Sequence, residues 1–376
     1  MYALEDLITV AKRENNTKRK YLYVNPVQGK HIPVSPSASM RLFADLTEKI
    51  EERYQDEKLL LIGFAETATA IGASIAYGSD NVAYYMNTSR EEISGAEYLF
   101  FTEAHSHATE QRLAVNGFDG ILDQIDRIVF AEDEVTTGNT IENIIRLLRK
   151  RYPDRSLNFG IVSVLNSMSD ERLAVFERQN IFCDFLYRIP FQFRIDSVEH
   201  HSYLKPQQDP IYETHTPVDT MKKSGYWNSR LLADVADIRA RTDQFAKSVL
   251  SNQKNIENAG SILILGTEEF MFPGMMIGCE IEKRWPDKTV RFHATTRSPI
   301  EVSQDPDYML HSRHPLASMY DNDRRTFIYN LERYDLVLIV TDAEVCRDGL
   351  DSLVAALEMH GNSNITLIQW GSFSNA

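Results

Sequence analysis

Residues 128–140, Ile-Val-Phe-Ala-Glu-Asp-Glu-Val-Thr-Thr-Gly-Asn-Thr, constrain the fold of this chain more than any other stretch. An apolar run leads into the acidic pair Glu132 and Asp133, and a small turn rich in hydroxyl groups follows. Apolar residues at helical spacing then continue from Ile141 to Lys150. The stretch therefore predicts a buried strand, a tight turn and an amphipathic helix, which together form one unit of an α/β fold.

The residue types in this stretch also predict a ligand. Two adjacent carboxylates can accept hydrogen bonds from the vicinal hydroxyl groups of a sugar. The turn at 136–140 presents backbone N–H groups at the start of a helix, where a phosphate is favoured. The stretch therefore favours a site for a sugar phosphate.

Strand and helix patterns alternate along the rest of the chain, which predicts a parallel, doubly wound sheet. Ligands of such sheets bind at the carboxyl ends of the strands, where the acidic pair is expected. Further strands are expected at 59–64, 98–102, 158–164, 261–266, 289–293, 336–340 and 365–369, with helices at 67–77 and 228–251. Residues 201–228 are rich in proline and polar residues and are interpreted as a connector.

The two halves resemble each other, which suggests a diverged duplication. The three matched segments are Gly63–Glu66 with Gly266–Glu269, the end of the 98–102 strand with Ala294–Pro299, and Ile128–Asp133 with Leu336–Asp342. The second copy has neither an acidic pair nor a Thr-x-Gly-x-Thr turn after its third strand. One sugar-phosphate site, not two, is therefore expected.

Composition and charge restrict the class of partner. The net charge is −14 and basic residues form no long run, which argues against duplex nucleic acid. No apolar run is long enough to span a bilayer, and the N-terminus does not have the pattern of a secretory signal. The three cysteines are scattered, as is typical of proteins from a reducing compartment. A cytoplasmic protein that binds neither membrane nor nucleic acid is expected.

Three other segments carry groups suited to ligand binding. Residues Ala65, Glu66, Thr67 and Ala68 follow a glycine at a strand end, where the backbone can approach a ligand or simply pack a helix on the sheet. Lys30 and His31 are interpreted either as part of a cover over a base or as a surface turn. Thr296, Arg297 and Ser298 combine hydroxyl groups with a guanidinium, which suits an anion, although Pro299 also fits an ordinary turn.

The 128–140 stretch resembles the phosphoribosyl pyrophosphate (PRPP) signature of type I phosphoribosyltransferases. That pattern is an apolar strand, two acidic residues, two variable residues and Thr-x-Gly-x-Thr/Ser. The sequence Thr-Arg-Ser-Pro at 296–299 resembles the TRSP domain that follows such a domain in a bacterial family of tellurite-resistance-type stress operons. The resemblance implies a phosphoribosyltransferase domain at 1–200, a connector and helix at 201–255, and a TRSP-type α/β domain at 256–376. It implies a cytoplasmic enzyme that makes a nucleotide-like metabolite.

The resemblance also implies roles for individual residues. Glu132 and Asp133 are expected to bind the ribose hydroxyl groups as catalytic residues. Mg²⁺ is expected to contact Asp133 indirectly or through PRPP. The 65–68 turn is expected to bind pyrophosphate. A loop over 103–120 is expected to close on the site, with His105 and Arg112 as catalytic residues. Glu134 departs from the family pattern and has no assigned role. The 5′-phosphate is expected to bind at Val135, Thr136, Thr137, Gly138, Asn139 and Thr140.

Other functions stay open at this point. The chain could sense PRPP without turning it over, or it could be bifunctional, with Glu269, Thr296, Arg297 and Ser298 processing the product in the C-terminal domain. The acceptor is expected to resemble a nucleobase, but the sequence does not name it. Many members of the family form dimers, so a homodimer is one expected assembly, and a duplication could provide that contact within one chain.

Overall fold

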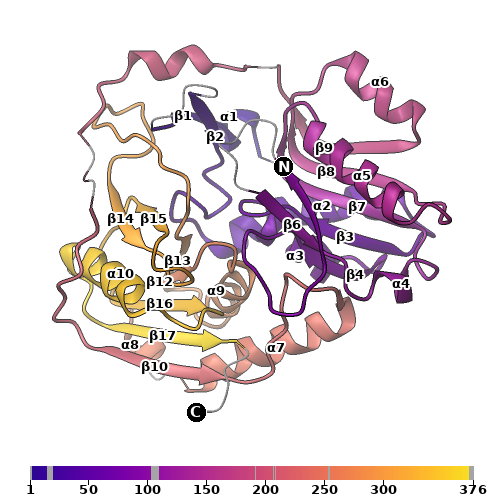
Figure 1. Cartoon of the computed structure of the whole chain (residues 1–376). Helices are drawn as coiled ribbons and strands as arrows, with labels where there is room; N and C mark the ends of the chain where they lie inside the picture. Colours follow the sequence, from indigo (N-terminus) through magenta and orange to yellow (C-terminus); the bar gives the residue numbers. More distant parts are fainter. Residues whose placement is uncertain are drawn as a thin grey trace. The chain divides into compact units, whose positions relative to one another are not determined.

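The computed structural model describes residues 2–14, 20–102, 110–190, 192–205, 207, 209–252 and 255–371. Its contacts divide the chain into two compact units (Figure 1). The first unit comprises residues 41–193 and 227–240, and the second comprises residues 1–40, 194–226 and 241–376. Residues 1–40 therefore group with the C-terminal half of the chain. The predicted domain boundaries at 200 and 255 stay predictions.

The first unit contains a six-stranded sheet in the order β11-β4-β3-β7-β8-β9. All neighbouring strands are parallel except the short β11. Every residue of β3 and β8 is buried, which explains why their sequences are largely apolar. The strands are β3 (Leu59–Gly63), β4 (Val82–Asn87), β7 (Arg127–Val135), β8 (Phe159–Asn166), β9 (Ile181–Arg188) and β11 (Ala233–Asp234).

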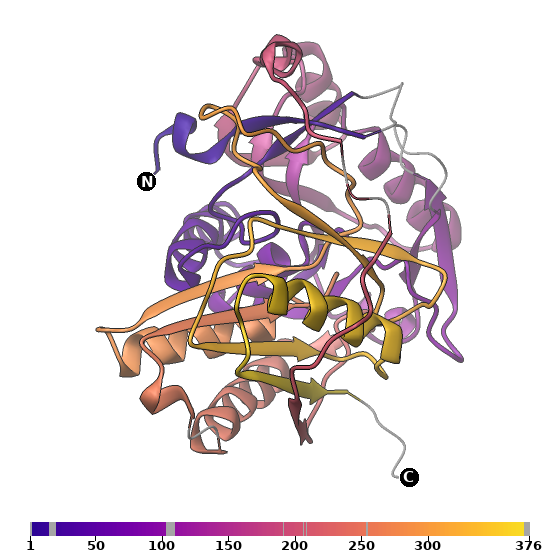
Figure 2. The same cartoon turned by 90° about the vertical axis from the view of Figure 1, so that its left-hand side faces the viewer.

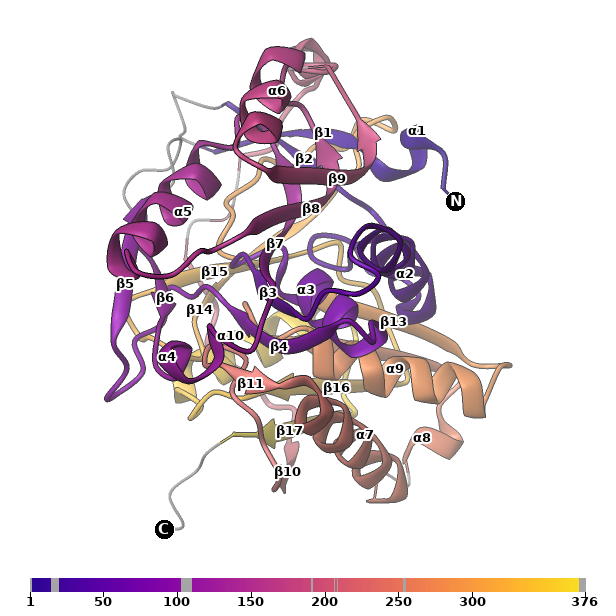
Figure 3. The same cartoon turned by 90° about the vertical axis from the view of Figure 1, so that its right-hand side faces the viewer.

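Helices cover both faces of this sheet, as the doubly wound prediction requires. Helix α3 (Thr69–Gly78) follows β3, whereas α5 (Asn139–Arg151) and α6 (Asp170–Arg178) follow β7 and β8 on the other face (Figure 3). The remaining elements are α2 (Pro36–Arg53), α4 (Phe118–Ile121) and an antiparallel hairpin of β5 (Tyr98–Thr102) and β6 (Glu110–Ala114). The carboxyl ends of β3, β7 and β8 therefore meet at one edge of the sheet.

The second unit contains a parallel sheet in the order β10-β17-β16-β12-β13. Gly274 and Gly278 of α9 approach Ile264, whereas α10 packs on Leu263 and Leu265 (Figure 2). Because successive strand residues face opposite ways, α9 and α10 cover opposite faces. The elements are β10 (Val218–Lys223), β12 (Ser261–Gly266), α9 (Phe272–Arg284), β13 (Thr289–Ala294), β16 (Leu336–Thr341), α10 (Arg347–Met359) and β17 (Ile365–Trp370).

Shorter elements complete the second unit. Two antiparallel pairs, β1 with β2 and β14 with β15, lie outside the main sheet. Helix α7 (Val235–Asn252) begins in the first unit and ends in the second. The others are α1 (Leu4–Leu7), β1 (Thr9–Lys12), β2 (Tyr21–Val24), the 3-10 helix η1 (Ile195–His200), α8 (Asn255–Asn258), β14 (Arg313–Ala317) and β15 (Arg325–Tyr329).

The structure confirms the α/β class and corrects three details of the strand prediction. The strand expected at 98–102 belongs to the β5–β6 hairpin, and the sheet position beside β3 is taken by β4, which the apolar pattern did not indicate. The connector at 201–228 contains β10, a largely polar strand at the edge of its sheet. Strand β7 continues to Val135, so the acidic pair lies within the strand and not after it.

The two sheets repeat one arrangement of corresponding elements. In each, the first strand (β3 or β12) is followed by a helix and by the strand on one side of it (β4 or β13). An antiparallel hairpin comes next, β5–β6 or β14–β15, and the chain then returns to the other side of the first strand as β7 or β16. A further helix leads to β8 or β17. A diverged duplication would produce this repetition.

One buried histidine predicts how the stability of the second unit depends on pH. His293 in β13 is fully buried with Nε2 2.7 Å from the carbonyl oxygen of Tyr329, and burial lowers its pKa to about 4. The unfolded chain therefore takes up a proton near pH 6.5, before the folded chain does. The stability that neutral His293 contributes is present above pH 6.5 and is lost as the pH falls toward 4.

We expect the unfolding free energy to fall by about 2 kcal/mol from this histidine between pH 7 and pH 5. Urea unfolding at the two pH values measures the loss. The His293→Asn variant provides the control, because it cannot take up this proton. An equal loss in the variant and the wild type would contradict the assignment to His293.

Candidate functional site

The acidic pair lies beside the turn that was predicted to bind pyrophosphate. The backbone N–H of Phe64 donates to the carbonyl of Ala131 at 3.1 Å, so the turn after β3 starts next to the acids of β7. Asp133 is hydrogen-bonded to the side chains of Thr67 and Glu132, while its burial raises the pKa of its carboxyl. The structure therefore brings together Glu132, Asp133 and the 65–68 turn, as the sequence predicted.

The turn between β7 and α5 depends on a glycine. Gly138 has φ of +72° and directly precedes α5, so the backbone is in the left-handed region that glycine adopts without strain. A Cβ atom at this position would lie 2.8 Å from Phe176 and 2.9 Å from Met168. The turn is thus tightly packed against Phe176 and Met168. Its N–H groups lie at the start of a 13-residue helix.

Arg172, near the start of α6, is hydrogen-bonded to this turn and to α5. Its Nε donates to the carbonyl of Thr137 at 2.9 Å, and its Nη2 donates to Glu142 at 2.7 Å and to Asn139 at 3.2 Å. The guanidinium also lies 4.7 Å from the ring of Phe176. The sequence analysis did not identify Arg172, because its role depends on the packing of α6 against the turn.

The turn after β3 is held by the end of β4. The N–H of Thr88 donates to the carbonyl of Gly63 at 2.8 Å, and the Thr88 hydroxyl accepts from the N–H of Ala65 at 2.9 Å. Gln111 of β6 donates to the carbonyl of Ala65 at 3.0 Å and accepts from Thr88. Because the N–H and the carbonyl of Ala65 are both bound by buried side chains, the turn is fixed close to Asp133.

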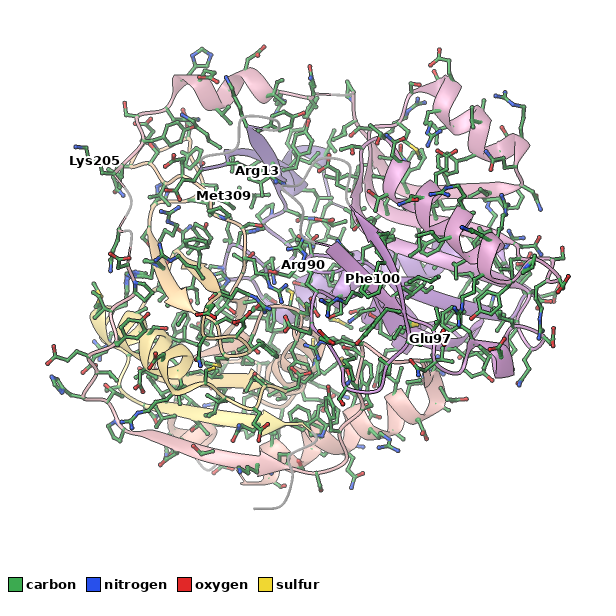
Figure 4. The ribbon with its side chains drawn as sticks, in the orientation of Figure 1. Arg13, Arg90, Glu97, Phe100, Lys205 and Met309 are labelled. Atoms are coloured by element: carbon green, nitrogen blue, oxygen red, sulfur yellow. The ribbon has the colours of Figure 1, made fainter. Side chains whose placement is uncertain are left out.

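A further candidate residue, Arg90, comes directly after this segment in the sequence. The sequence analysis did not identify it. The residues Thr88-Ser89-Arg90 continue from β4 at the same edge of the sheet as the acids (Figure 4). Ser89 forms two backbone hydrogen bonds with Arg112, which fixes the segment on the hairpin. The signal was present in the sequence, because Thr-Ser-Arg-x-x-Ile at 88–93 is repeated as Thr-Thr-Arg-x-x-Ile at 295–300.

Arg112 was predicted as a catalytic residue, but its side chain contacts Glu92 and aromatic residues of the β5–β6 hairpin. Its Nη1 lies 3.4 Å from a carboxylate oxygen of Glu92, and its guanidinium lies 5.8 Å from the rings of both Tyr98 and Phe100. Phe100, labelled in Figure 4, is 48% exposed. His105, the other predicted residue of this loop, lies outside the described residues, as do all of 103–109. The role of Arg112 stays a prediction.

A pocket of about 920 Å³ opens beside the predicted phosphate turn. The hydroxyl of Ser167 is buried and makes no hydrogen bond within the described part of the chain. Arg188 forms an ion pair with Asp170 at 2.6 Å. The pocket is lined by Thr136, Thr137 and Asn139 of the turn, by 167–172 after β8, by Arg188 at the end of β9, and by Ile189 and Pro190 after it.

The predicted C-terminal site residues are also brought together, within the second unit. Arg297 pairs with Glu268 at 2.5 Å and with Glu269 at 3.6 Å, and the two glutamates are buried. Thr296 is buried and pairs with Phe327 of β15. Lys30 is neither on the surface nor in the first unit: its ammonium donates to the carbonyls of Glu268 and Thr295 at 2.6 and 3.1 Å. Ser298 donates its backbone N–H to Thr296 at 3.2 Å.

The carboxylates beside the 65–68 turn are the candidate ligands for the predicted magnesium ion. Among the described residues, no three His, Cys, Asp or Glu side chains are grouped so as to hold a metal ion. Glu132 and Asp133 supply carboxylate oxygens near the 65–68 turn, because Asp133 is hydrogen-bonded to both Glu132 and Thr67. This set fits Mg²⁺, which proteins commonly bind through one or two carboxylates together with substrate phosphates and water.

Two family models cover most of the chain. Residues 7–189 match the family described as phosphoribosyl transferase, and residues 232–357 match the TRSP domain found C-terminal to it. The chain belongs to the phosphoribosyltransferases that carry a C-terminal TRSP domain. The fusion inferred from the two sequence motifs is therefore confirmed. A comparison with curated proteins found no match.

Solved phosphoribosyltransferases are similar to part of the chain. Adenine phosphoribosyltransferase from Rhodothermus marinus is 15% identical, with 50% of this chain and 96% of that one covered and a TM-score of 0.34. The Trypanosoma brucei adenine enzyme, solved with AMP, pyrophosphate and ribose-5-phosphate, is 14% identical over 48% and 76%, with a TM-score of 0.35. A Staphylococcus aureus hypoxanthine enzyme is 14% identical over 44% and 79%, with a TM-score of 0.25.

In the TRSP-containing chain, none of the described helices meets the length and apolarity needed to cross a membrane.

Proposed function

We propose that the phosphoribosyltransferase domain transfers the phosphoribosyl group of PRPP to a nucleobase-like acceptor, or catalyses the reverse reaction. The bond from C1 of the ribose to pyrophosphate breaks, a bond from C1 to an acceptor nitrogen forms, and the acceptor proton leaves. The observation that carries the proposal is the juxtaposition of Asp133, the turn held by Thr88, and the Gly138 turn at the start of α5.

Each part of this site has a distinct task. Glu132 and Asp133 accept hydrogen bonds from the ribose hydroxyl groups, and the N–H groups at 136–140 bind the 5′-phosphate. The 65–68 turn, with Arg90 beside it, binds the leaving pyrophosphate. Mg²⁺ bound with PRPP would supply positive charge to that group. The fixed side chains thus position the reacting atoms and stabilise charge.

We assign the acceptor to the pocket beside the phosphate turn. Its volume of about 920 Å³ suits a ligand larger than a base alone, and it combines apolar Met168 and Ile189 with the buried hydroxyl of Ser167. A flat heterocycle with a hydrogen-bonding edge fits this lining. The stress-response role implied by the tellurite-resistance resemblance, a cytoplasmic location and a homodimer remain parts of the proposal.

Release of pyrophosphate in the presence of PRPP, Mg²⁺ and a panel of purine and pyrimidine bases tests the function. Turnover should require both one base and the metal, so a chelator should abolish it. PRPP binding without release of pyrophosphate for any base would instead favour a sensor. Turnover that requires an intact Arg297 would favour the bifunctional alternative.

A comparison of two arginines tests the assignment of the pyrophosphate subsite. Arg90 follows the strand end, whereas Arg112 is held by Glu92 and the hairpin aromatics. We therefore expect Arg90→Gln to reduce turnover about tenfold through loss of one charge-assisted contact. Arg112→Gln should change turnover less than threefold. Steady-state kinetics on both variants measure this, and the opposite ranking would return the role to Arg112, as the sequence predicted.

A further inference from the structure

The two units share corresponding hydrogen bonds as well as the same order of strands. In the first unit, Thr88 donates to the carbonyl of Gly63 and accepts from the N–H of Ala65. In the second unit, Thr295 donates to the carbonyl of Gly266 at 3.1 Å, and its hydroxyl accepts from the N–H of Glu268 at 3.0 Å. Glu268 therefore stands where the first unit has Ala65.

The same correspondence extends to the neighbouring strands. Ser89 pairs with the β6 strand as Thr296 pairs with β15, so Arg297 stands where the first unit has Arg90. The register of β12 with β16 places Val340 opposite Gly266, as the register of β3 with β7 places Ala131 opposite Gly63. Asp342 therefore corresponds to Asp133, and the turn with Glu268 corresponds to the pyrophosphate turn.

The structure shows what fills this second turn. Glu268 is 1% exposed and has φ of +49°, which residues other than glycine seldom adopt. Its carboxylate accepts from the hydroxyl of Ser318 at 2.5 Å, from Nε of Arg297 at 2.5 Å and from Nη1 of Arg324 at 3.2 Å. Two guanidinium groups and a hydroxyl group thus converge on one carboxylate.

Such a convergence of donors is the arrangement that binds a phosphate group in other proteins. The donors come from three segments, namely the end of β13 and both sides of the β14–β15 turn. Burial of these charges is costly unless each is paired. Glu268 provides the negative charge that the two arginines share, while Glu269 lies 3.6 Å from Arg297 and Asp321 lies 3.3 Å from Arg324. The side chains of Arg297 and Arg324 are only 10% and 20% exposed, so removal of Glu268 would leave two poorly solvated cations.

We propose that the second unit contains an anion site that its own Glu268 carboxylate occupies. The site would accept a phosphate or diphosphate group in place of Glu268. In the wild type the tethered carboxylate excludes that group, which leaves the chain with one PRPP site. Asp342 is similarly held from within, because Tyr320 and Tyr226 donate to its two oxygens at 2.6 and 2.7 Å.

Isothermal titration of the full chain with inorganic pyrophosphate tests the proposal. We compare the wild type, Glu268→Ala, and Glu268→Ala combined with Arg297→Gln, because binding in the first unit is common to all three. Glu268→Ala should gain a second binding event, and the affinity of that event should fall at least tenfold in the double variant. Parallel titrations with inorganic phosphate and AMP show whether the site takes a free anion or the phosphate of a nucleotide.

Two results would overturn the proposal. One is an equal pyrophosphate affinity of Glu268→Ala and the double variant, which would mean that Arg297 binds no anion. The other is a second pyrophosphate site of the same affinity in the wild type, which would mean that Glu268 excludes nothing. Should Glu268→Ala fail to fold, Glu268→Gln retains the side-chain volume, removes the charge and is subject to the same two results.

Discussion

We expect the Asp133→Asn variant to bind PRPP about 100-fold more weakly than the wild type. An asparagine retains the size of the side chain but loses the negative charge that accepts hydrogen bonds from the ribose hydroxyl groups. Hydrogen bonds to charged groups contribute about 1.5–3 kcal/mol each, and about 2.7 kcal/mol corresponds to 100-fold in affinity. Calorimetric titration with PRPP and Mg²⁺ measures the change directly.

The repeat provides a matched control for this experiment. Asp342 occupies the corresponding position of the second sheet, where Tyr320 and Tyr226 hold its carboxylate. Asp342→Asn therefore changes the same chemical group in the same strand position and should leave the PRPP affinity unchanged. Unaltered PRPP affinity in Asp133→Asn, or an equal loss in the two variants, would contradict the assignment of the ribose site to β7.

The second large effect is expected for Gly138→Ala. Alanine pays about 1 kcal/mol for the left-handed backbone, and its methyl group would lie within 3 Å of Phe176 and Met168. Overpacking of this kind typically costs about 1–3 kcal/mol more. Because the displaced backbone carries the N–H groups at the start of α5, we expect PRPP affinity to fall at least tenfold and the unfolding free energy to fall by about 2–4 kcal/mol.

Gly95→Ala separates the steric effect from the backbone effect. Gly95 also has a positive φ, +78°, but a Cβ atom there meets nothing within 4 Å. Its variant should lose about 1 kcal/mol of stability and no PRPP affinity. Urea unfolding and titration with PRPP apply to both variants. If Gly138→Ala behaved like Gly95→Ala, the packing beneath the turn would not govern phosphate binding.

The sequence predicted those parts of the site that are made of consecutive residues. The 128–140 stretch combines strand, acids, turn and helix within one window, so its pattern alone indicated both structure and ligand. The prediction that the 65–68 turn lies near these acids also needed only the parallel order of β3 and β7. Such features depend on local pattern and on the topology of doubly wound sheets.

The parts that the sequence did not predict depend on contacts between distant residues. Strand β4 contains a partly buried Tyr84 and a fully buried Tyr85, and its sequence is less apolar than the 98–102 run, whose Phe100 is exposed. Because the 98–102 run was matched with the strand before Thr295 in place of β4, the two halves were compared with the wrong segments aligned. The match of Arg90 with Arg297 was therefore not recognised. Glu268 was overlooked in favour of Glu269, because only the hydrogen bonds of Thr295 show which glutamate occupies the turn.

The position of Lys30 has a consequence for how the chain matures. Its ammonium group is fully buried and donates to the carbonyl of Thr295, 265 residues later in the sequence. At a synthesis rate of ~5–20 residues per second, about 13–50 s separate the two on the ribosome. Throughout that interval the Thr295 carbonyl that accepts from Lys30 has not yet been made. A chain cut near residue 200 would remain in that state permanently, so a loss of activity on truncation would not by itself locate catalysis in the C-terminal half.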